Sequence, residues 1–215
     1  RGAATVGRLV EALSALRLDV PVFDRAADPD SPAARGAYPR LAAEVDVAGA
    51  LAALLIDRWS PDLLAASPKG EGTRLDALRG TRGALCLSNE ERDDCLSTLA
   101  SLASMLHGWT NMPVAARKRL AAGHRFLSAL AILRTIDAGQ AEAIGVDVRA
   151  LSGQFGGISP VPLLSGDALI AAGLKPGPRF KRILEQVYDA QLEGRVSTTT
   201  QALALAMELG GETGV

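Results

Sequence analysis

Leucine and alanine supply most of the apolar content of this chain, and that choice constrains its fold more than any other feature. Hydrophobic residues make up 48% of the 215 residues and aromatic residues only 4%, so the core must be built mainly from aliphatic side chains. Leu and Ala are strong helix formers, and long runs of β-branched residues are nearly absent. The sequence therefore predicts an all-α fold, in which a bundle-like body of several helices is followed by a small helical tail module.

Turn-forming residues divide the chain into three regions. Residues 1–40 combine a short amphipathic helix over 5–18 with a linker rich in Pro, Asp and Ser. Residues 41–150 carry the helical patterns of the body, and residues 151–215 carry those of the tail. The boundary near residue 150 rests on the stretch 139–161, which is rich in glycine and is predicted to be irregular.

The body is predicted to contain one helix buried on all sides and one with a clear start. Residues 41–58 include AGALAALLI, whose apolar circumference indicates a helix in the centre of a bundle. Ser88 precedes Glu91 by three residues, which is the spacing of a capping box at a helix start. Pro113 and Gly123 mark the start and the end of the next helix. The core stripe of the capped helix consists of Leu96, Leu99, Leu102, Met105 and Leu106.

The tail is predicted to hold three helices separated by tight turns. A short helix spans about 166–172, and Gly173 ends it because glycine readily takes the left-handed conformation. Pro178 begins a longer helix that runs to about Gly194, since proline is favoured at the first helical position. Thr198 and Gln201 then form a second capping box before ALALAMELG.

The turn between the first two tail helices is the first candidate site. A helix N-terminus presents amide groups that favour an anion, yet basic side chains in a first turn are unfavourable to the helix itself. This cost suggests a functional reason, and phosphate binding is the simplest. The alternative is an ordinary helix–turn–helix corner with solvated charges. The candidate RNA-binding residues of this turn are Lys175, Gly177, Arg179, Lys181 and Arg182.

A second candidate surface lies in an interval that contains no acidic residue. Between Asp94 and Asp137 every charged side chain is basic, although the net charge of the whole chain is −1. Aromatic residues are few there, so the pattern favours contact with a duplex backbone over stacking on single-stranded bases. The alternative is a helix face whose acidic partners come from elsewhere in the fold. The candidate RNA-binding residues of this interval are Arg117, Lys118, Arg119 and Arg125.

No complete catalytic or metal site is visible in the sequence. Asp28 and Asp30 form a D-x-D pair, but they lie in a Pro-rich linker and are interpreted as a turn rather than as magnesium ligands. Cys86 and Cys95 have no metal spacing, which suggests small buried apolar residues or inert thiols of a reducing cytoplasm. No stretch of about 18 uncharged apolar residues predicts a membrane span. The chain starts at Arg1 rather than Met, which suggests a fragment that lacks an upstream domain.

Residues 162–205 closely resemble the C-terminal tail of bacterial CCA-adding enzymes and poly(A) polymerases, which are class II tRNA nucleotidyltransferases. The tail of that family reads Pro-x-Leu-(Thr/Ser)-Gly, then Gly-Leu-x-Pro-Gly-Pro, then Gln-x-Glu-Gly. The matching positions are Pro162, Leu164, Ser165, Gly166, Leu169, Gly173, Leu174, Pro176, Gly177, Pro178, Gln191, Glu193 and Gly194. Leu51–Asp57 and Leu85–Glu90 are more weakly similar to the body of the family, so the resemblance covers about the last three-quarters of the chain.

The resemblance implies an architecture of head, neck, body and tail, in which body and tail grip the tRNA backbone. The Gly-rich strand–turn of the catalytic head, its paired carboxylates and the nucleotide-reading motif of the neck do not occur in this sequence. Mg²⁺ and CTP or ATP are therefore expected only in a head domain outside these residues, with no cofactor in the chain itself. Whether the chain carries out a reaction of its own stays open.

Two other functions remain as alternatives. The Leu- and Ala-rich faces at 41–58 and 94–106 suit a helical protein-interaction or oligomerisation module without RNA binding, including a homodimer. An HD-type metallohydrolase would need a His and Asp cluster, and Ile56-Asp57 lacks the His of the family's Leu-His-Asp. The partners expected from the resemblance are tRNA and an N-terminal catalytic head, with no membrane.

Overall fold

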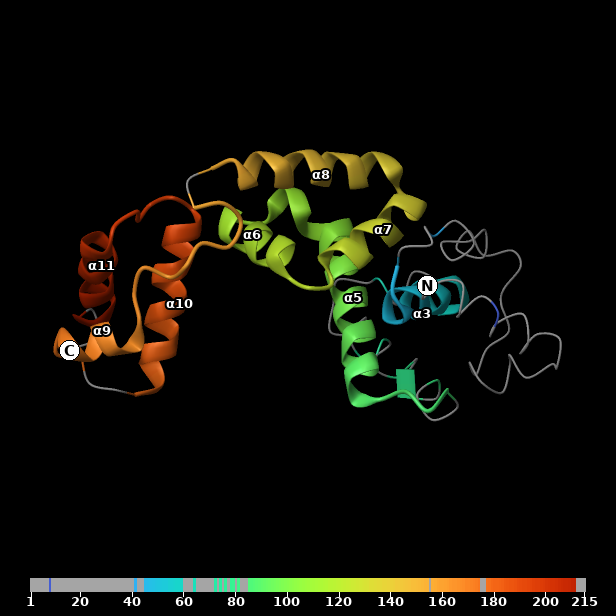
Figure 1. Cartoon of the computed structure of the whole chain (residues 1–215), viewed down its shortest axis with the longest axis horizontal. Coiled ribbons are helices and arrows are strands. Elements are labelled where there is room, and N and C mark those ends of the chain that lie inside the picture. Colours follow the sequence, from blue (N-terminus) through green and yellow to red (C-terminus); the bar gives the residue numbers. More distant parts are fainter. Residues whose placement is uncertain are drawn as a thin grey trace. The chain divides into compact units, whose positions relative to one another are not determined.

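The computed structural model is all-α throughout the part of the chain that it describes (Figure 1). The described residues are 8, 41, 45–59, 64, 72, 74, 76, 78–79, 81, 85–154, 156–174 and 177–211. Within them the backbone forms helices and turns and no strand, which confirms the predicted fold class. The expected helix over 5–18 apart from residue 8, the linker with Asp28 and Asp30, and Lys175 lie outside the described residues.

The chain divides into two compact units. Unit 1 comprises residues 1–111 and 123–146, and unit 2 comprises residues 112–122 and 147–215. The predicted boundary near residue 150 lies close to the division at 146, but the sequence did not indicate that the segment 112–122 belongs with the tail.

The described part of unit 1 is built around α3, α5 and α7. The bounds of these helices and of the 3-10 turn η3 are α3 (Val47–Trp59), α5 (Asn89–Gly108), η3 (Trp109–Asn111) and α7 (Phe126–Ile136). The apolar run of α3 is almost wholly buried from Ala50 to Ile56, which confirms its predicted place at the centre. The helix α5 packs against both α3 and α7. Because the central helix is rich in alanine, its neighbours pack close to its backbone.

The capping box of α5 forms as predicted. The Glu91 amide donates to the Ser88 hydroxyl at 3.1 Å, and the Ser88 amide donates to the Glu91 carboxylate at 2.9 Å. Leu99, Leu102 and Met105 are fully buried in the predicted stripe, whereas Leu96 and Leu106 are only half-buried. Cys95 lies in the same core, and burial raises the pKa of its thiol to about 12.

Residues 139–152 are helical, and the prediction of irregular structure there is wrong. The helix α8 runs over Ala138–Ser152, and its first turn is capped by Asp137, whose carboxylate accepts from the Gln140 amide at 2.9 Å. Ala141, Ile144 and Leu151 are buried along one face. Packing of that face outweighs the cost of about 1 kcal/mol for each glycine in a helix. Irregular backbone begins only at Gly153.

Unit 2 contains α6 (Val114–Ala122), α9 (Gly166–Ala171), α10 (Pro178–Leu192) and α11 (Thr199–Gly211). The helix α10 packs against α6 and α11. Pro178 stands at the start of α10, and Gly173 takes the left-handed conformation at φ +90°, both as predicted. Thr198 caps α11, since its hydroxyl accepts from the Gln201 amide at 3.3 Å. The Gln201 carboxamide oxygen accepts from the Ser197 amide at 2.9 Å rather than from the Thr198 amide that the capping box predicts.

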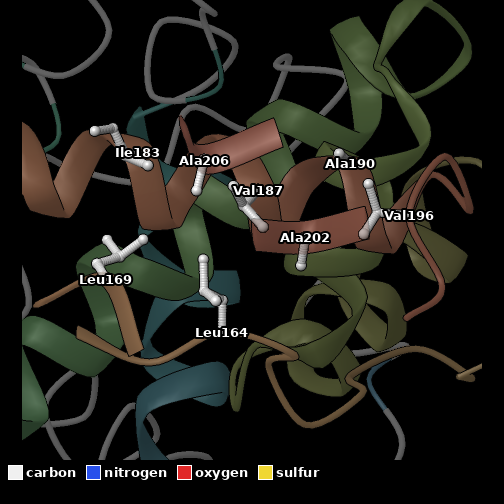
Figure 2. Close-up of a cluster of buried hydrophobic side chains, with 8 residues drawn as sticks. All are labelled: Leu164, Leu169, Ile183, Val187, Ala190, Val196, Ala202 and Ala206. Carbon is white, nitrogen blue, oxygen red and sulfur yellow. The ribbon is translucent and has the colours of Figure 1, made fainter. Parts of the chain in front are cut away.

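An aliphatic cluster forms the core of unit 2 (Figure 2). It draws side chains from α9, α10 and α11, from the residues just before α9 and from the segment between α10 and α11. The buried members are Leu164, Leu169, Ile183, Val187, Ala190, Val196, Ala202 and Ala206. Because the members from α10 recur at intervals of three and four residues, one face of that helix is fixed toward the core and the opposite face toward solvent.

Gly49 in α3 allows close packing against α7, and its replacement provides a test. A Cβ atom there would lie 2.4 Å from Val45 Cγ1 and 3.2 Å from Ser128 Cβ. We expect Gly49→Ala to destabilise the protein by about 1–2 kcal/mol, because overpacking outweighs the gain of about 1 kcal/mol in helix propensity. Gly139 occupies a similar early position in α8, and a Cβ atom there would have no neighbour nearer than 3.5 Å. Gly139→Ala should therefore be neutral or stabilising when urea midpoints are compared.

Candidate nucleic-acid interface

The three described cations at the start of α10 are exposed. Arg179, Lys181 and Arg182 all reach solvent from the first two turns of the helix. Lys181 lies 3.9 Å from Glu185, one helical turn further on. Among the described residues, no carboxylate lies within ion-pair distance of Arg179 or Arg182. The predicted corner is thus on the surface, and two of its cations have no acidic partner there.

The backbone at this corner also has no polar cap from a side chain. Gly177 is the N-cap of α10, it is extended and exposed, and no side chain accepts a hydrogen bond there. The helix carries no acidic residue in its first turn and no basic residue in its last turn. Its charges therefore run against its dipole, and cationic side chains add to the partial positive charge of the N-terminus. This arrangement gives the corner a positive potential that favours a polyanion.

The second predicted surface, formed by Arg117, Lys118, Arg119 and Arg125, is not a free positive patch. This expectation assumed that no counter-charge was available, and the structure shows that assumption to be wrong. Arg117 pairs with Asp147 at 2.9 Å, and Arg119 pairs with Asp189 at 2.7 Å. The acidic partners are 30 and 70 residues away in sequence, so the interval itself gave no sign of them.

Arg119 is held by two further contacts within unit 2. Its guanidinium lies 5.0 Å from the centre of the Tyr188 ring, a cation–π contact, and it donates to the Glu185 carbonyl at 3.4 Å. The Tyr188 hydroxyl in turn donates to the Pro160 carbonyl at 3.0 Å. Arg119 therefore joins α6 to α10, and its charge is already partnered by Asp189.

Arg125 holds together the starts of three helices in unit 1. It is the N-cap residue of α7, and it pairs with Asp46, which caps α3, and with Asp94 in α5. His124 adds a contact to Asp94 at 2.9 Å. The Arg125 side chain is mostly buried, and its Nε atom has no hydrogen-bond partner among the described residues. A guanidinium engaged in this way has a structural role.

Lys118 is the least exposed cation of the set. Only 1% of its surface is accessible, and desolvation by burial lowers the pKa of its ammonium group. The side chain therefore packs against the protein along its length instead of extending into solvent. It does not contribute to a surface that a large polyanion reaches.

Gln191 anchors the segment that leads into the tail helices. Its side-chain amide donates to the Val161 carbonyl at 2.8 Å and accepts from the Leu163 amide at 3.0 Å. Both halves of this buried amide are therefore satisfied by one short stretch of extended chain. Sequence reasoning gave Gln191 only a place in the resemblance, and its structural role depends on a contact across about 30 residues.

A depression of about 320 Å³ lies beside α10 and α11, away from the predicted corner. Its charged lining residues already have partners: Asp189 pairs with Arg119 at 2.7 Å, and Glu193 pairs with Arg195 at 2.7 Å. The lining residues are Gln186, Asp189, Glu193, Arg195, Leu205 and Leu209. Neither here nor in the rest of the described part of the chain do three His, Cys, Asp or Glu side chains come together as a metal centre requires.

No protein-family model, curated protein or solved structure matches this chain. None of the described helices is both long enough and apolar enough to cross a membrane.

Asp46 provides a pH test of the Arg125 cluster. Burial alone would raise the pKa of its carboxyl, but hydrogen bonds from Gly49, Arg125 and Ser128 and the charge of Arg125 outweigh burial and lower it below 3.8. A lowered carboxyl pKa stabilises the fold above pH 3.8, and that stabilisation is lost as the pH falls through the folded-state pKa. Asp46→Asn should cost about 0.5–1 kcal/mol at neutral pH, because asparagine keeps the cap but loses the ion pair with Arg125, and the Asp46 side chain in that pair is about half exposed.

Urea midpoints of the wild type and Asp46→Asn measured across the acid range test this expectation. The difference between the two proteins should shrink as the pH falls through the lowered pKa of Asp46 in the folded state, because the wild-type carboxyl then becomes protonated. Asp46→Ala should lose about 1 kcal/mol more at every pH because it also removes the cap. A difference between wild type and Asp46→Asn that does not change with pH would contradict the role of the charge.

Lys118 generates a second stability prediction. Because its pKa is lowered in the folded state, the fold is penalised at every pH where the amine is protonated in the unfolded chain. Lys118→Met keeps the long side chain and removes the charge. We expect a gain of about 0.5–2 kcal/mol at neutral pH in chemical denaturation. Lys118→Gln, which keeps a polar group in the interior, should not show this gain.

Proposed function

We propose that unit 2 binds the sugar–phosphate backbone of a folded RNA through Arg179, Lys181 and Arg182. The observation that carries this proposal is the exposure of these three cations on one end of α10, with no carboxylate near two of them among the described residues. Phosphate contacts position a protein on nucleic acid without reading its sequence. The binding is therefore governed by charge and shape, not by base identity.

The resemblance of residues 162–205 to the tail of class II tRNA nucleotidyltransferases identifies tRNA as the proposed RNA. In this proposal the chain is the body and tail of a CCA-adding enzyme or poly(A) polymerase. Nucleotide addition, Mg²⁺ and CTP or ATP belong to a catalytic head, and the chain itself supplies grip on the tRNA in the cytoplasm. The second candidate surface contributes little, because its cations are paired or buried.

The double variant Arg179→Ala/Arg182→Ala tests the proposal in a filter-binding titration with tRNA. Each phosphate contact that is lost removes about one counterion from the release on binding. We expect weaker binding and a slope of log K against log salt that is less steep by about 2 between about 50 and 200 mM salt. A hairpin duplex RNA of unrelated sequence should show the same change.

The control is Lys118→Met/Arg134→Ala, which removes the same number of positive charges. Lys118 is buried, and Arg134 is an exposed cation of α7 in unit 1. This control should bind tRNA with the wild-type slope. Absence of tRNA binding by the wild type at low salt, or equal losses in both double variants, would refute the proposal.

A helical protein-interaction module is the second candidate. The faces at 41–58 and 94–106 on which it was expected to depend are, where the structure describes them, largely buried in the core of unit 1, whereas Leu127 and Val161 are more than three-quarters exposed. The other large exposed hydrophobic side chains are scattered over several elements, as on ordinary protein surfaces. Sedimentation velocity distinguishes the two functions, since a mass that rises with concentration and does not respond to RNA supports the interaction module.

A further inference from the structure

We infer that Glu185 limits the RNA-binding surface of α10, so that the surface holds only two or three consecutive phosphates. This inference rests on the proposed function. It assigns Glu185 the role of a residue that weakens phosphate binding, and it excludes the second half of the helix from contact with the RNA.

The three exposed cations define the end of the surface at the start of α10. Arg179 and Arg182 lie three residues apart on neighbouring turns, so their side chains emerge from the same face of α10. Lys181 belongs to the same end of the helix but emerges from another face, and its ammonium group lies 3.9 Å from the Glu185 carboxylate. Both members of that pair are more than half exposed, so a phosphate reaches the ammonium group from solvent and competes with the carboxylate.

Beyond this point the neighbouring cations already have acidic partners of their own. Arg119 pairs with Asp189, and Arg195 pairs with Glu193. Glu185, Asp189 and Glu193 follow one another at intervals of four residues, so a carboxylate stands on each successive turn from the middle of α10 to its C-cap. A phosphate that moved along the helix would meet negative charge and cations that are already paired. The surface therefore ends at Glu185.

A site that neutralises two or three phosphates has a measurable signature. The slope of log K against log salt for a duplex is about −0.9 for each phosphate neutralised. Wild-type protein should therefore show a slope of about −2 to −3, much less steep than a protein that follows a whole groove. Removing the carboxylate that competes for Lys181 should free one more charge for the RNA.

Glu185→Gln tests this role in tRNA titrations over a range of salt concentrations. We expect affinity to rise about twofold to fivefold at low salt, as an exposed ion pair of ordinary strength allows. The slope should steepen by up to about 1. The control is Glu208→Gln, an exposed acid of α11 in the same unit, which makes the same change in net charge. A Lys181→Ala/Glu185→Gln variant should lose the gain, since the freed ammonium group is absent.

The outcomes separate this inference from the function on which it rests. If the wild type binds tRNA and depends on Arg179 and Arg182, but Glu185→Gln matches the wild type or Glu208→Gln, only the role of Glu185 is overturned. A wild-type slope much steeper than about −3 would overturn the limit of two or three phosphates. If the wild type does not bind tRNA at low salt, both the function and the inference are overturned.

Discussion

The packing of one face of α10 into the core of unit 2 determines which of its side chains reach solvent. Ile183, Val187 and Ala190 are buried on one face of α10, and the helical repeat places Arg182 on a different face, toward solvent. Arg179 lies one turn before Ile183 and is exposed because it stands in the first turn of the helix. Burying a Val or Ile side chain contributes about 1.5–3 kcal/mol, whereas a cation in a first turn costs about 0.3–1 kcal/mol. The hydrophobic term is larger, so the helix tolerates a basic N-terminus that its dipole disfavours.

The positions that carry the family resemblance are mainly positions that specify the fold of unit 2. Gly173 and Gly194 adopt positive φ angles of +90° and +75°, which favour glycine. Ser165 caps α9, and Gln191 fixes the chain at Val161 and Leu163. The cations proposed to contact RNA are not among these positions. The same fold can therefore form without the basic side chains at the start of α10. The case for RNA binding rests on the exposed charges.

Features set by neighbouring residues were predictable from the sequence. The capping box at Ser88, the proline start of α10 and the burial of α3 each depend on a few adjacent positions or on one periodic pattern. The helix α8 was not predicted, because its glycines indicate irregular structure and its apolar face is short. The cap at Asp137 is a weaker signal in the sequence than these glycines. A helix of this kind depends on tertiary packing more than on propensity, and packing is not visible in a local window.

Charge pairing marks the limit of sequence reasoning most clearly. The interval from Asp94 to Asp137 contains no acid, yet Arg125 pairs with Asp46 from 79 residues away, and Arg117 and Arg119 find partners 30 and 70 residues away. A pair at i,i+4 is different, because the helix alone brings Lys181 and Glu185 together. With lysine on the N-terminal side, this pair has the weaker of the two orientations. The interaction that is readable from sequence is thus also the one that a phosphate displaces with least cost.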